Sequence, residues 1–212
     1  MKIALIGASG GLGSRIVKEA LEHGHEIKAF CRHEIKEAEK QITVVKKSLF
    51  DMTAKDVEEC DVFISAFGSG FQADPHLNYE AFLQYIKLNQ KAKRPTIVIG
   101  GAGSLYTDDT RTTLCMEEQE YPDFLYPISK NIAAGIQKLC ENDFPWTVVS
   151  PPVVFDQNQP GCGEYQIMAA DYVVYNQKKE SYATYDDVAK AMVKIAEEQN
   201  YPKQRVVVVS ER

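Results

Sequence analysis

Residues 2–13 of the chain read KIALIGASGGLG. The continuous apolar run ends at Gly7, which is typical of a strand buried on both faces of a parallel sheet. Residues 12–22 follow with apolar side chains at helical spacing, and Gly24 marks the end of that helix. The segment therefore predicts a strand, a glycine-rich turn and a helix, which together are the opening unit of an α/β fold.

The turn places glycines at a G-x-x-G-x-x-G spacing, a variant of the dinucleotide-binding fingerprint. Gly7 permits the tight turn, Gly10 lets a pyrophosphate approach the backbone, and Gly13 lets the helix pack on the strand. The N-terminus of the helix offers free N–H groups and a partial positive charge to phosphates. A glycine-rich turn without a ligand is the alternative. The predicted dinucleotide contacts of this turn are Gly7, Ser9, Gly10, Gly11, Leu12 and Gly13.

The composition is that of a soluble globular protein, since apolar residues make up 44% and charged residues 25% of the 212 residues. The net charge is −6 and no basic stretch stands out, so no nucleic-acid partner is expected. Mean hydropathy is −0.30, and no apolar run approaches the roughly 20 residues that span a bilayer. The chain also lacks the pattern of a secretory signal. We therefore expect a cytoplasmic protein without a membrane partner.

The five cysteines are an odd number and include no C-x-x-C pair, which argues against a disulfide framework and against a zinc site. His23 and His25 flank Gly24 in a predicted helix-to-strand turn, and the other two histidines stand apart from them. The sequence spacing therefore predicts no metal site.

Strands and helices alternate along the chain, which predicts a doubly wound parallel sheet of the Rossmann type. The chain is expected to form a single domain over residues 1–212, in which residues 151–212 contribute a small C-terminal cap over the substrate. Residues 102–125 show no clear period and are expected to form a loop. Further strands are expected at 26–31, 42–46, 61–66, 96–100, 146–150, 171–175 and 205–209. Further helices are expected at 54–59, 76–92, 127–141 and 185–198.

The end of the second strand carries Arg32 and no carboxylate. A carboxylate there usually meets the free ribose 2′-hydroxyl of NADH, whereas an arginine is suited to the 2′-phosphate of NADPH. Arg32 therefore favours NADP(H) over NAD(H), and a solvated surface arginine is the alternative. Small residues after the fourth strand let the backbone pass under the ribose. They give Ala66, Phe67 and Gly68 as further cofactor contacts, with a simple strand-end turn as the alternative.

Tyr126 and Lys130 lie four positions apart at the start of a predicted helix and so share one helix face. A nearby ammonium stabilises tyrosinate, which suits Tyr126 to donate a proton to a carbonyl that receives hydride. Lys130 also suits the nicotinamide ribose. Ser104, beyond the fifth strand, supplies the hydroxyl that completes such a site. The alternative is an aromatic packing residue beside a solvated lysine.

Several stretches, in order along nearly the whole chain, resemble the short-chain dehydrogenase/reductase superfamily and within it the atypical NmrA-like, NADH-flavin reductase-like branch of NAD(P)-binding proteins. They are GASGGLGSRIV (7–17), VFISAFG (62–68), IVIGGAGSL (97–105), FPWTVVSPPVVF (144–155), GEYQI (163–167) and ATYDDVAKAMV (183–193). The resemblance implies a Rossmann sheet with a reduced C-terminal cap and a glycine turn that binds pyrophosphate.

The resemblance also implies roles for residues outside that turn. Arg32 would select NADP, Ala66 to Gly68 would line the ribose, and Pro151 with Val153 would flank the nicotinamide. Related sequences commonly carry an aspartate after the third strand, at the adenine. Here Ser48 stands in that place, followed by Leu49, which implies an adenine contact that is weaker or made differently.

These patterns predict an NAD(P)H-dependent oxidoreductase, a monomer or a homodimer, that passes hydride to a flavin such as FMN or FAD, a quinone or a conjugated carbonyl. The tyrosine–lysine pair is not a dependable feature of this branch, so Tyr126 fits either a proton donor or a cofactor contact. An NADP(H)-sensing regulator that turns over nothing is the alternative. A nucleotide-sugar epimerase or dehydratase is disfavoured because only about 60 residues follow the sixth strand, too few for a separate sugar domain.

Overall fold

The computed structural model of the chain describes residues 1–32 and 41–211, and the sheet at its centre has eight strands in the order β3-β2-β1-β4-β5-β6-β10-β8. All neighbouring pairs are parallel except β10 and β8, which run antiparallel. The predicted doubly wound parallel sheet is therefore confirmed, with one antiparallel edge strand. The strands are β1 (Lys2–Ile6), β2 (Glu26–Cys31), β3 (Ile42–Lys46), β4 (Val62–Ser65), β5 (Thr96–Ile99), β6 (Trp146–Ser150), β8 (Tyr165–Ala169) and β10 (Gln204–Ser210).

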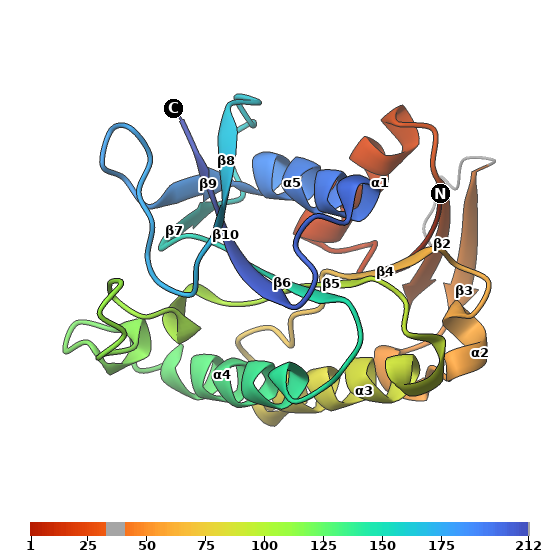
Figure 1. Cartoon of the computed structure of the whole chain (residues 1–212), viewed down its shortest axis with the longest axis horizontal. Coiled ribbons are helices and arrows are strands. Elements are labelled where there is room, and N and C mark those ends of the chain that lie inside the picture. The colour runs from red at the N-terminus through yellow and green to blue at the C-terminus, as the bar shows by residue number, and fades with distance from the viewer. Residues whose placement is uncertain (33–40, 212) are drawn as a thin grey trace.

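Helices cover both faces of this sheet (Figure 1). The upper layer in the view holds α1 (Gly11–Glu22) and α5 (Tyr185–Glu198), which pack against each other. The lower layer holds α3 (His76–Ala92) and α4 (Tyr126–Cys140), with the short α2 (Ala54–Val57) at its end. Among the described residues no helix combines the length and the apolar character that crossing a membrane requires.

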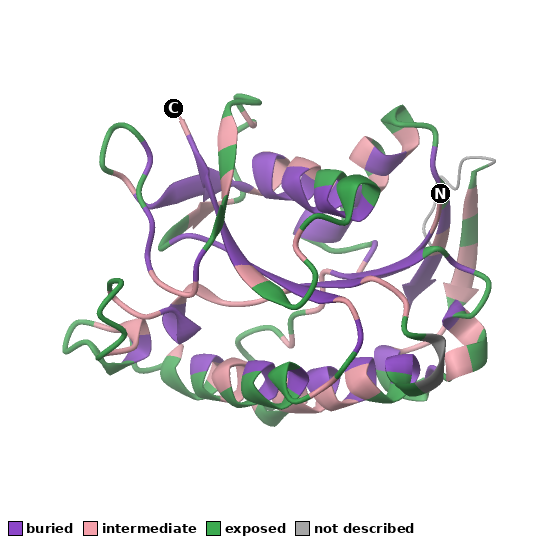
Figure 2. Ribbon diagram, viewed as in Figure 1, coloured by how far each residue is buried: buried purple, intermediate pink, exposed green. Residues whose placement is uncertain are grey.

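The apolar run of β1 is continuous because both faces of the strand are buried. Ile3 and Leu5 belong to the core beneath α1 and α5, whereas Ala4 and Ile6 belong to the core above α3 and α4. Figure 2 shows the same burial through the middle of the sheet. Successive side chains of a strand point to opposite faces, so a strand between two helical layers has no polar face.

The expected strand at 171–175 is wrong. Residues Tyr165–Ala169 form β8 instead, paired with β10. Val173 and Val174 are buried in a third core cluster with Leu105 and Val207, and the Val173 amide donates to the Tyr106 carbonyl outside any strand ladder. This apolar run is therefore accounted for by packing against β10.

Residues 151–212 do more than cap the sheet. They provide β10 and β8 to it and α5 to one of its helical layers. Two short strands that the sequence did not predict, β7 (Val154–Asp156) and β9 (Tyr182–Thr184), pair in parallel beside the sheet. The predicted helix at 54–59 is shorter, ending at Val57, and the predicted loop at 102–125 contains only two single 3₁₀ turns, Ala102–Ser104 and Cys115–Glu117.

The turn between β1 and α1 depends on close backbone contact. A Cβ added to Gly13 would lie 1.9 Å from the carbonyl oxygen of Gly7 and 3.0 Å from the Cα of Ala8. Gly7 itself has φ +80°, and a Cβ there would lie 2.9 Å from the carbonyl oxygen of Ala66. Because these neighbours are backbone atoms, a side chain at either position displaces the strand or the helix.

We expect Gly13→Ala to lower the free energy of unfolding by about 3 kcal/mol or more, at the upper end of the cost of overpacking. Gly68→Ala is the matched control, because a Cβ at Gly68 meets nothing within 4 Å. Urea unfolding of both variants measures the difference. Equal stability of the two variants would contradict the tight β1–α1 contact.

Candidate functional site

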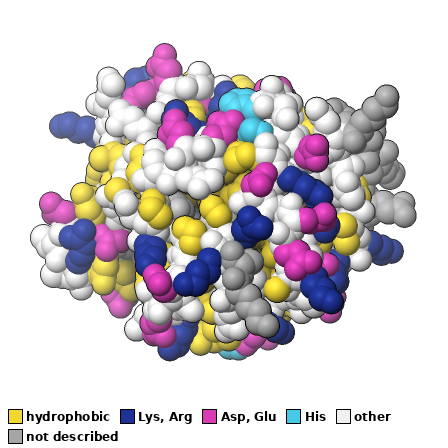
Figure 3. All heavy atoms as spheres, turned by 45° about the vertical axis from the view of Figure 1, so that its right-hand side comes forward, with side chains coloured by type: hydrophobic (Ala, Val, Ile, Leu, Met, Phe, Trp, Pro, Cys, Tyr) yellow, Lys and Arg dark blue, Asp and Glu magenta, His cyan; other side chains and the backbone are white. Residues whose placement is uncertain are grey.

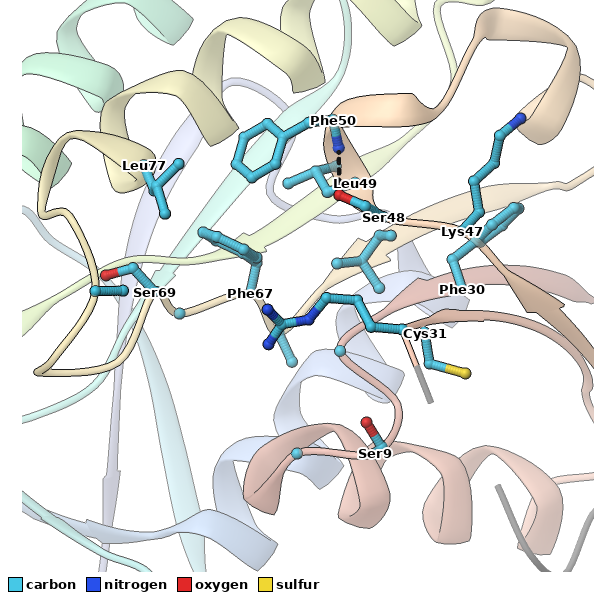
Figure 4. Close-up of a pocket in the computed structure, with 17 residues that line it drawn as sticks. Ser9, Phe30, Cys31, Lys47, Ser48, Leu49, Phe50, Phe67, Ser69 and Leu77 are labelled. Carbon is cyan, nitrogen blue, oxygen red and sulfur yellow. Dashed lines mark hydrogen bonds between the residues drawn. The ribbon is translucent and has the colours of Figure 1, made fainter. Parts of the chain in front are cut away.

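A pocket of about 390 Å³ opens at the carboxyl ends of β1, β2 and β4, where the chain leaves the sheet (Figure 4). This edge is where ligands bind in open α/β sheets. Nine of the predicted cofactor residues line the pocket. Other lining residues, among them Lys47, Phe50 and Ser69, were not predicted as cofactor contacts. The nine are Gly7, Ser9, Gly10, Arg32, Ser48, Leu49, Ala66, Phe67 and Gly68.

The N-terminus of α1 borders this pocket with unused backbone donors. The first i to i−4 hydrogen bond there runs from the Ser14 amide to the Gly10 carbonyl, so the amides before it have no partner of that kind. Gly10 is the N-cap and provides no side-chain cap, and the first turn of α1 carries no acidic residue. An uncapped helix start, approached by a backbone that only glycine permits, fits a diphosphate group.

Arg32 follows the last residue of β2, is exposed, and lines the pocket. It has no ion-pair partner in the part of the chain that the structure describes, and His33 after it lies outside that part. Lys47 also borders the pocket, but Figure 4 shows its ammonium pointing away from it. Of the two cations, Arg32 is therefore the one available to an anion in the pocket.

The Lys47 ammonium is held by Asp56, at 2.8 and 3.0 Å from the two carboxylate oxygens. The same carboxylate accepts the Thr53 amide at 2.7 Å. Burial acts to raise the pKa of Asp56, but these hydrogen bonds outweigh it, so the pKa lies below its ordinary value. Ser48, at the place of the expected aspartate, accepts the Phe50 amide at 3.2 Å and starts the 3₁₀ turn Leu49–Asp51.

Aromatic side chains form the opposite wall of the pocket. The Phe50 and Phe67 rings meet edge to face, with centroids 5.7 Å apart. The Phe67 amide donates to the Ser65 hydroxyl at 3.3 Å, and that hydroxyl lies 2.8 Å from the buried Tyr85 hydroxyl. Burial raises the pKa of Tyr85, so it stays neutral. The two phenylalanine rings give this wall an apolar surface toward the pocket. The hydrogen bonds of the Phe67 amide and of Tyr85 to Ser65 hold the backbone behind it.

Tyr126 and Lys130 occupy one face of the first turn of α4, as predicted. Tyr126 is the first residue of the helix and is 42% exposed, and Lys130 is exposed one turn later. Neither side chain has a hydrogen-bond partner among the described residues, so both are available to a ligand. Neither lines the pocket at β1, β2 and β4.

Ser104 is buried, and its hydroxyl is engaged within its own loop. It donates to the Gly101 carbonyl at 2.7 Å and accepts from Arg205 Nη2 at 2.6 Å. A role of Ser104 in proton transfer stays a prediction. The structure brings two other hydroxyls together next to Gly103, those of Tyr121 and Ser129, which lie 2.7 Å apart.

The remaining predicted residues lie outside the pocket wall. Gly11, Leu12 and Gly13 form the first turn of α1 behind it, and Leu12 and Gly13 are buried there. Pro151 is buried at the end of β6, whereas Val153, two positions later, is 57% exposed. Their contact with a nicotinamide stays a prediction from the resemblance.

Arg205 of β10 connects three parts of the site, and the sequence analysis missed it. Its guanidinium donates to the Ser150 hydroxyl at 2.7 Å, the Ser104 carbonyl at 2.6 Å and the Gly101 carbonyl at 3.2 Å. Burial lowers the pKa of Arg205 to about 10, against the opposing charge of Asp171, so the group stays charged at neutral pH. Arg205 therefore fixes the loop after β5 against the end of β6.

We expect Arg205→Met to lower the free energy of unfolding by about 2–4 kcal/mol, because it strips hydrogen bonds from carbonyls that burial shields from water. Arg111→Met is the matched control. Arg111 pairs with Asp171 at 2.8 Å with half of its side chain exposed, so its loss should cost under about 1 kcal/mol. Urea unfolding compares the two variants, and equal costs would show that Arg205 does not hold the loop.

Comparisons with known proteins extend over the same glycine turn and sheet. The model of the NAD(P)H-binding family matches residues 7–199. YwnB of Bacillus subtilis (strain 168), described as an uncharacterized protein, is 37% identical over 213 residues, which cover 100% of this chain and 99% of YwnB.

Two solved structures show the same fold over the whole chain. SP1627 of Streptococcus pneumoniae TIGR4, described as "a putative NADH-flavin reductase", is 32% identical with a TM-score of 0.91, and the match covers 100% of both chains. A "putative epimerase" of Bacteroides thetaiotaomicron is 26% identical with a TM-score of 0.85, covering 100% of this chain and 97% of that one. Proteins of this fold thus carry descriptions of more than one chemistry.

Proposed function

Because the chain belongs to the NAD(P)H-binding family, we propose that it is an NAD(P)H-dependent reductase that passes hydride to a flavin, a quinone or a conjugated carbonyl. The observation that carries the proposal is the pocket at the uncapped start of α1, whose glycine backbone leaves room for a diphosphate. The description of the Streptococcus pneumoniae protein supports the choice of acceptor class. When bound, the nicotinamide supplies the hydride.

The residues of this chain bind and orient the two reactants. The turn from Gly7 to Gly13 receives the pyrophosphate, and Ala66 to Gly68 pass beneath the ribose. Tyr126 donates a proton to the acceptor or orients it, and Lys130 one turn later holds the nicotinamide ribose. Pro151 and Val153 flank the nicotinamide at the end of β6.

NADP(H) is the preferred coenzyme in this proposal. Arg32 lines the pocket at the end of β2 and has no carboxylate partner among the described residues, so its guanidinium is free for a 2′-phosphate. Lys47 does not replace it, because Asp56 holds its ammonium.

A second candidate, an NADP(H)-binding regulator without turnover, is favoured by one observation. The Ser104 hydroxyl is bound by Gly101 and Arg205, so the third member of the predicted catalytic set is already occupied. The binding residues are the same in both candidates, and only turnover separates them.

An assay of NADPH oxidation with FMN, a quinone and an aldehyde tests the proposal. We expect oxidation with at least one acceptor and, where Tyr126 donates the proton, a loss of about 10²-fold or more in Tyr126→Phe. Tyr175→Phe is the matched control, because Tyr175 is 57% exposed on another loop. Tight NADPH binding without any turnover would favour the regulator. Full activity of Tyr126→Phe would remove Tyr126 from proton transfer and leave the reductase standing.

We expect Arg32→Ala to weaken NADPH binding by about 10- to 100-fold, the value of a hydrogen-bonded charge pair, and to leave NADH binding nearly unchanged. Calorimetric titration with each coenzyme measures the two affinities. Lys47→Ala serves as the control, since it should leave the ratio of the two affinities as it is. A similar loss for both coenzymes in Arg32→Ala would refute the phosphate contact.

A further inference from the structure

His23, His25 and Glu197 meet at the amino end of β2, at the opposite edge of the sheet from the pocket. His23 is the C-cap residue of α1, and His25 directly precedes β2. Gly24 between them has φ +76°, which permits the sharp turn that brings both imidazoles to one side. Glu197 comes from the last turn of α5, which packs against α1.

Both imidazoles lie within hydrogen-bonding distance of the same carboxylate oxygen of Glu197. Glu197 Oε1 lies 2.8 Å from His23 Nδ1 and 2.9 Å from His25 Nε2. The three donor atoms all lie within 4.8 Å of one another. Burial acts to raise the pKa of Glu197, but the hydrogen bonds from both histidines outweigh it, and the carboxylate is ionised. Figure 3 shows histidine side chains at the surface of this face with carboxylates beside them.

A second carboxylate stands behind the first histidine. Glu19 Oε1 lies 3.2 Å from His23 Nε2, the ring nitrogen that faces away from Glu197. A histidine that binds a metal through one nitrogen commonly donates its other N–H to a carboxylate in this way. On the other ring, His25 Nδ1 lies 3.3 Å from the Met1 nitrogen.

In the described part of the chain, two carboxylates without a lysine or arginine partner face this cluster, against one cation, the N-terminal ammonium of Met1. Glu22 and Glu198, the neighbouring carboxylates on α1 and α5, have lysine partners, Lys18 and Lys194. Among the described residues, Glu19 and Glu197 have only histidine partners. The C-terminal ends of α1 and α5 also meet here, and each contributes the partial negative charge of a helix C-terminus.

We propose that His23, His25 and Glu197 form a binding site for a divalent transition metal ion, with Zn²⁺ as the representative. Two imidazole nitrogens and one carboxylate oxygen are the donors that Zn²⁺ takes in three-ligand sites with an open fourth position. Tetrahedral metal–ligand bonds of about 2.0–2.1 Å place the donor atoms about 3.3 Å apart. The Glu197 oxygen therefore has to move away from each imidazole nitrogen by about half an ångström, and the two nitrogens have to lie at about the same 3.3 Å from each other. Mg²⁺ and Ca²⁺ do not fit, because they prefer oxygen ligands.

The position of the site gives the metal a structural role. The ligands join the end of α1 and the start of β2 to the end of α5, elements more than 170 positions apart in the chain. The 42% exposure of the His23 side chain leaves a path from solvent and room for a water ligand. The bound metal therefore fastens α1 to α5 and stabilises the folded chain. This inference does not depend on the proposed reductase activity.

Titration of the EDTA-treated, desalted full chain with ZnCl₂, followed by calorimetry and by thermal unfolding, tests the site. We expect one saturable site with a Kd below about 10 µM and a rise in Tm, since a metal that binds only the folded state stabilises it. His23→Gln and Glu197→Gln should weaken binding by at least about 100-fold, and Glu19→Gln by about 10-fold. Circular dichroism verifies that each variant is folded.

His76→Gln is the matched control, because His76 forms another His–Glu pair, 3.0 Å from Glu80, to which the described part of the chain adds no third His, Cys, Asp or Glu ligand. It should bind Zn²⁺ like the unaltered chain. Co²⁺ absorption distinguishes the ligand type, and the proposed site should give d–d bands without a thiolate charge-transfer band. No saturable Zn²⁺ binding, binding unchanged in His23→Gln and Glu197→Gln, or a thiolate band lost only with a cysteine would each overturn the proposal.

Discussion

The carbonyl oxygen of Gly7 lies where any side chain on Gly13 would begin, and the site depends on that backbone contact. Because the first turn of α1 rests directly on the end of β1, the free amides of the helix face the pocket that β2 and β4 complete. A helix held a few ångströms further away would leave those amides to water. The positive φ of Gly7 and the close approach of Ala66 serve the same contact, since they let the turn pass beneath the neighbouring strand end.

Arg205 plays a comparable role at β5, β6 and β10, on the side of the sheet away from β1 and β2. A buried guanidinium is costly unless its donors are paired, and here carbonyl and hydroxyl oxygens of the loop after β5 and of β6 pair them. The loop between β5 and α4 is consequently fixed by a strand from the end of the chain. Residues 151–212 thus contribute β8 and β10 to the sheet and α5 to the helical layer that covers one of its faces.

The features that could be predicted depend on residues close together in the sequence, whereas the features that were missed depend on residues far apart in it. The buried strands and the glycine turn were predictable because their cause is local: two apolar faces, or three glycines at fixed spacing. The Arg205 network joins residues 101 positions apart, and two of its four hydrogen bonds end on backbone carbonyls, which leave no trace in the residue types. The failed strand at 171–175 has a similar origin, since Val173 and Val174 are apolar for a packing contact that only the folded sheet creates.

The two ends of α1 lie at opposite edges of the sheet and carry opposite partial charges. Its N-terminus, without a capping side chain or an acidic residue, directs partial positive charge at a pocket suited to phosphates. Its C-terminus, joined by that of α5, directs partial negative charge at two imidazoles and two carboxylates. The sequence spacing predicted no metal site, since His23-Gly24-His25 by itself offers only two ligands; the third residue of the proposed site comes from α5. Parallel strands place all carboxyl ends at one edge and all amino ends at the other. The same helix therefore presents partial positive charge at one edge of the sheet and partial negative charge at the opposite edge.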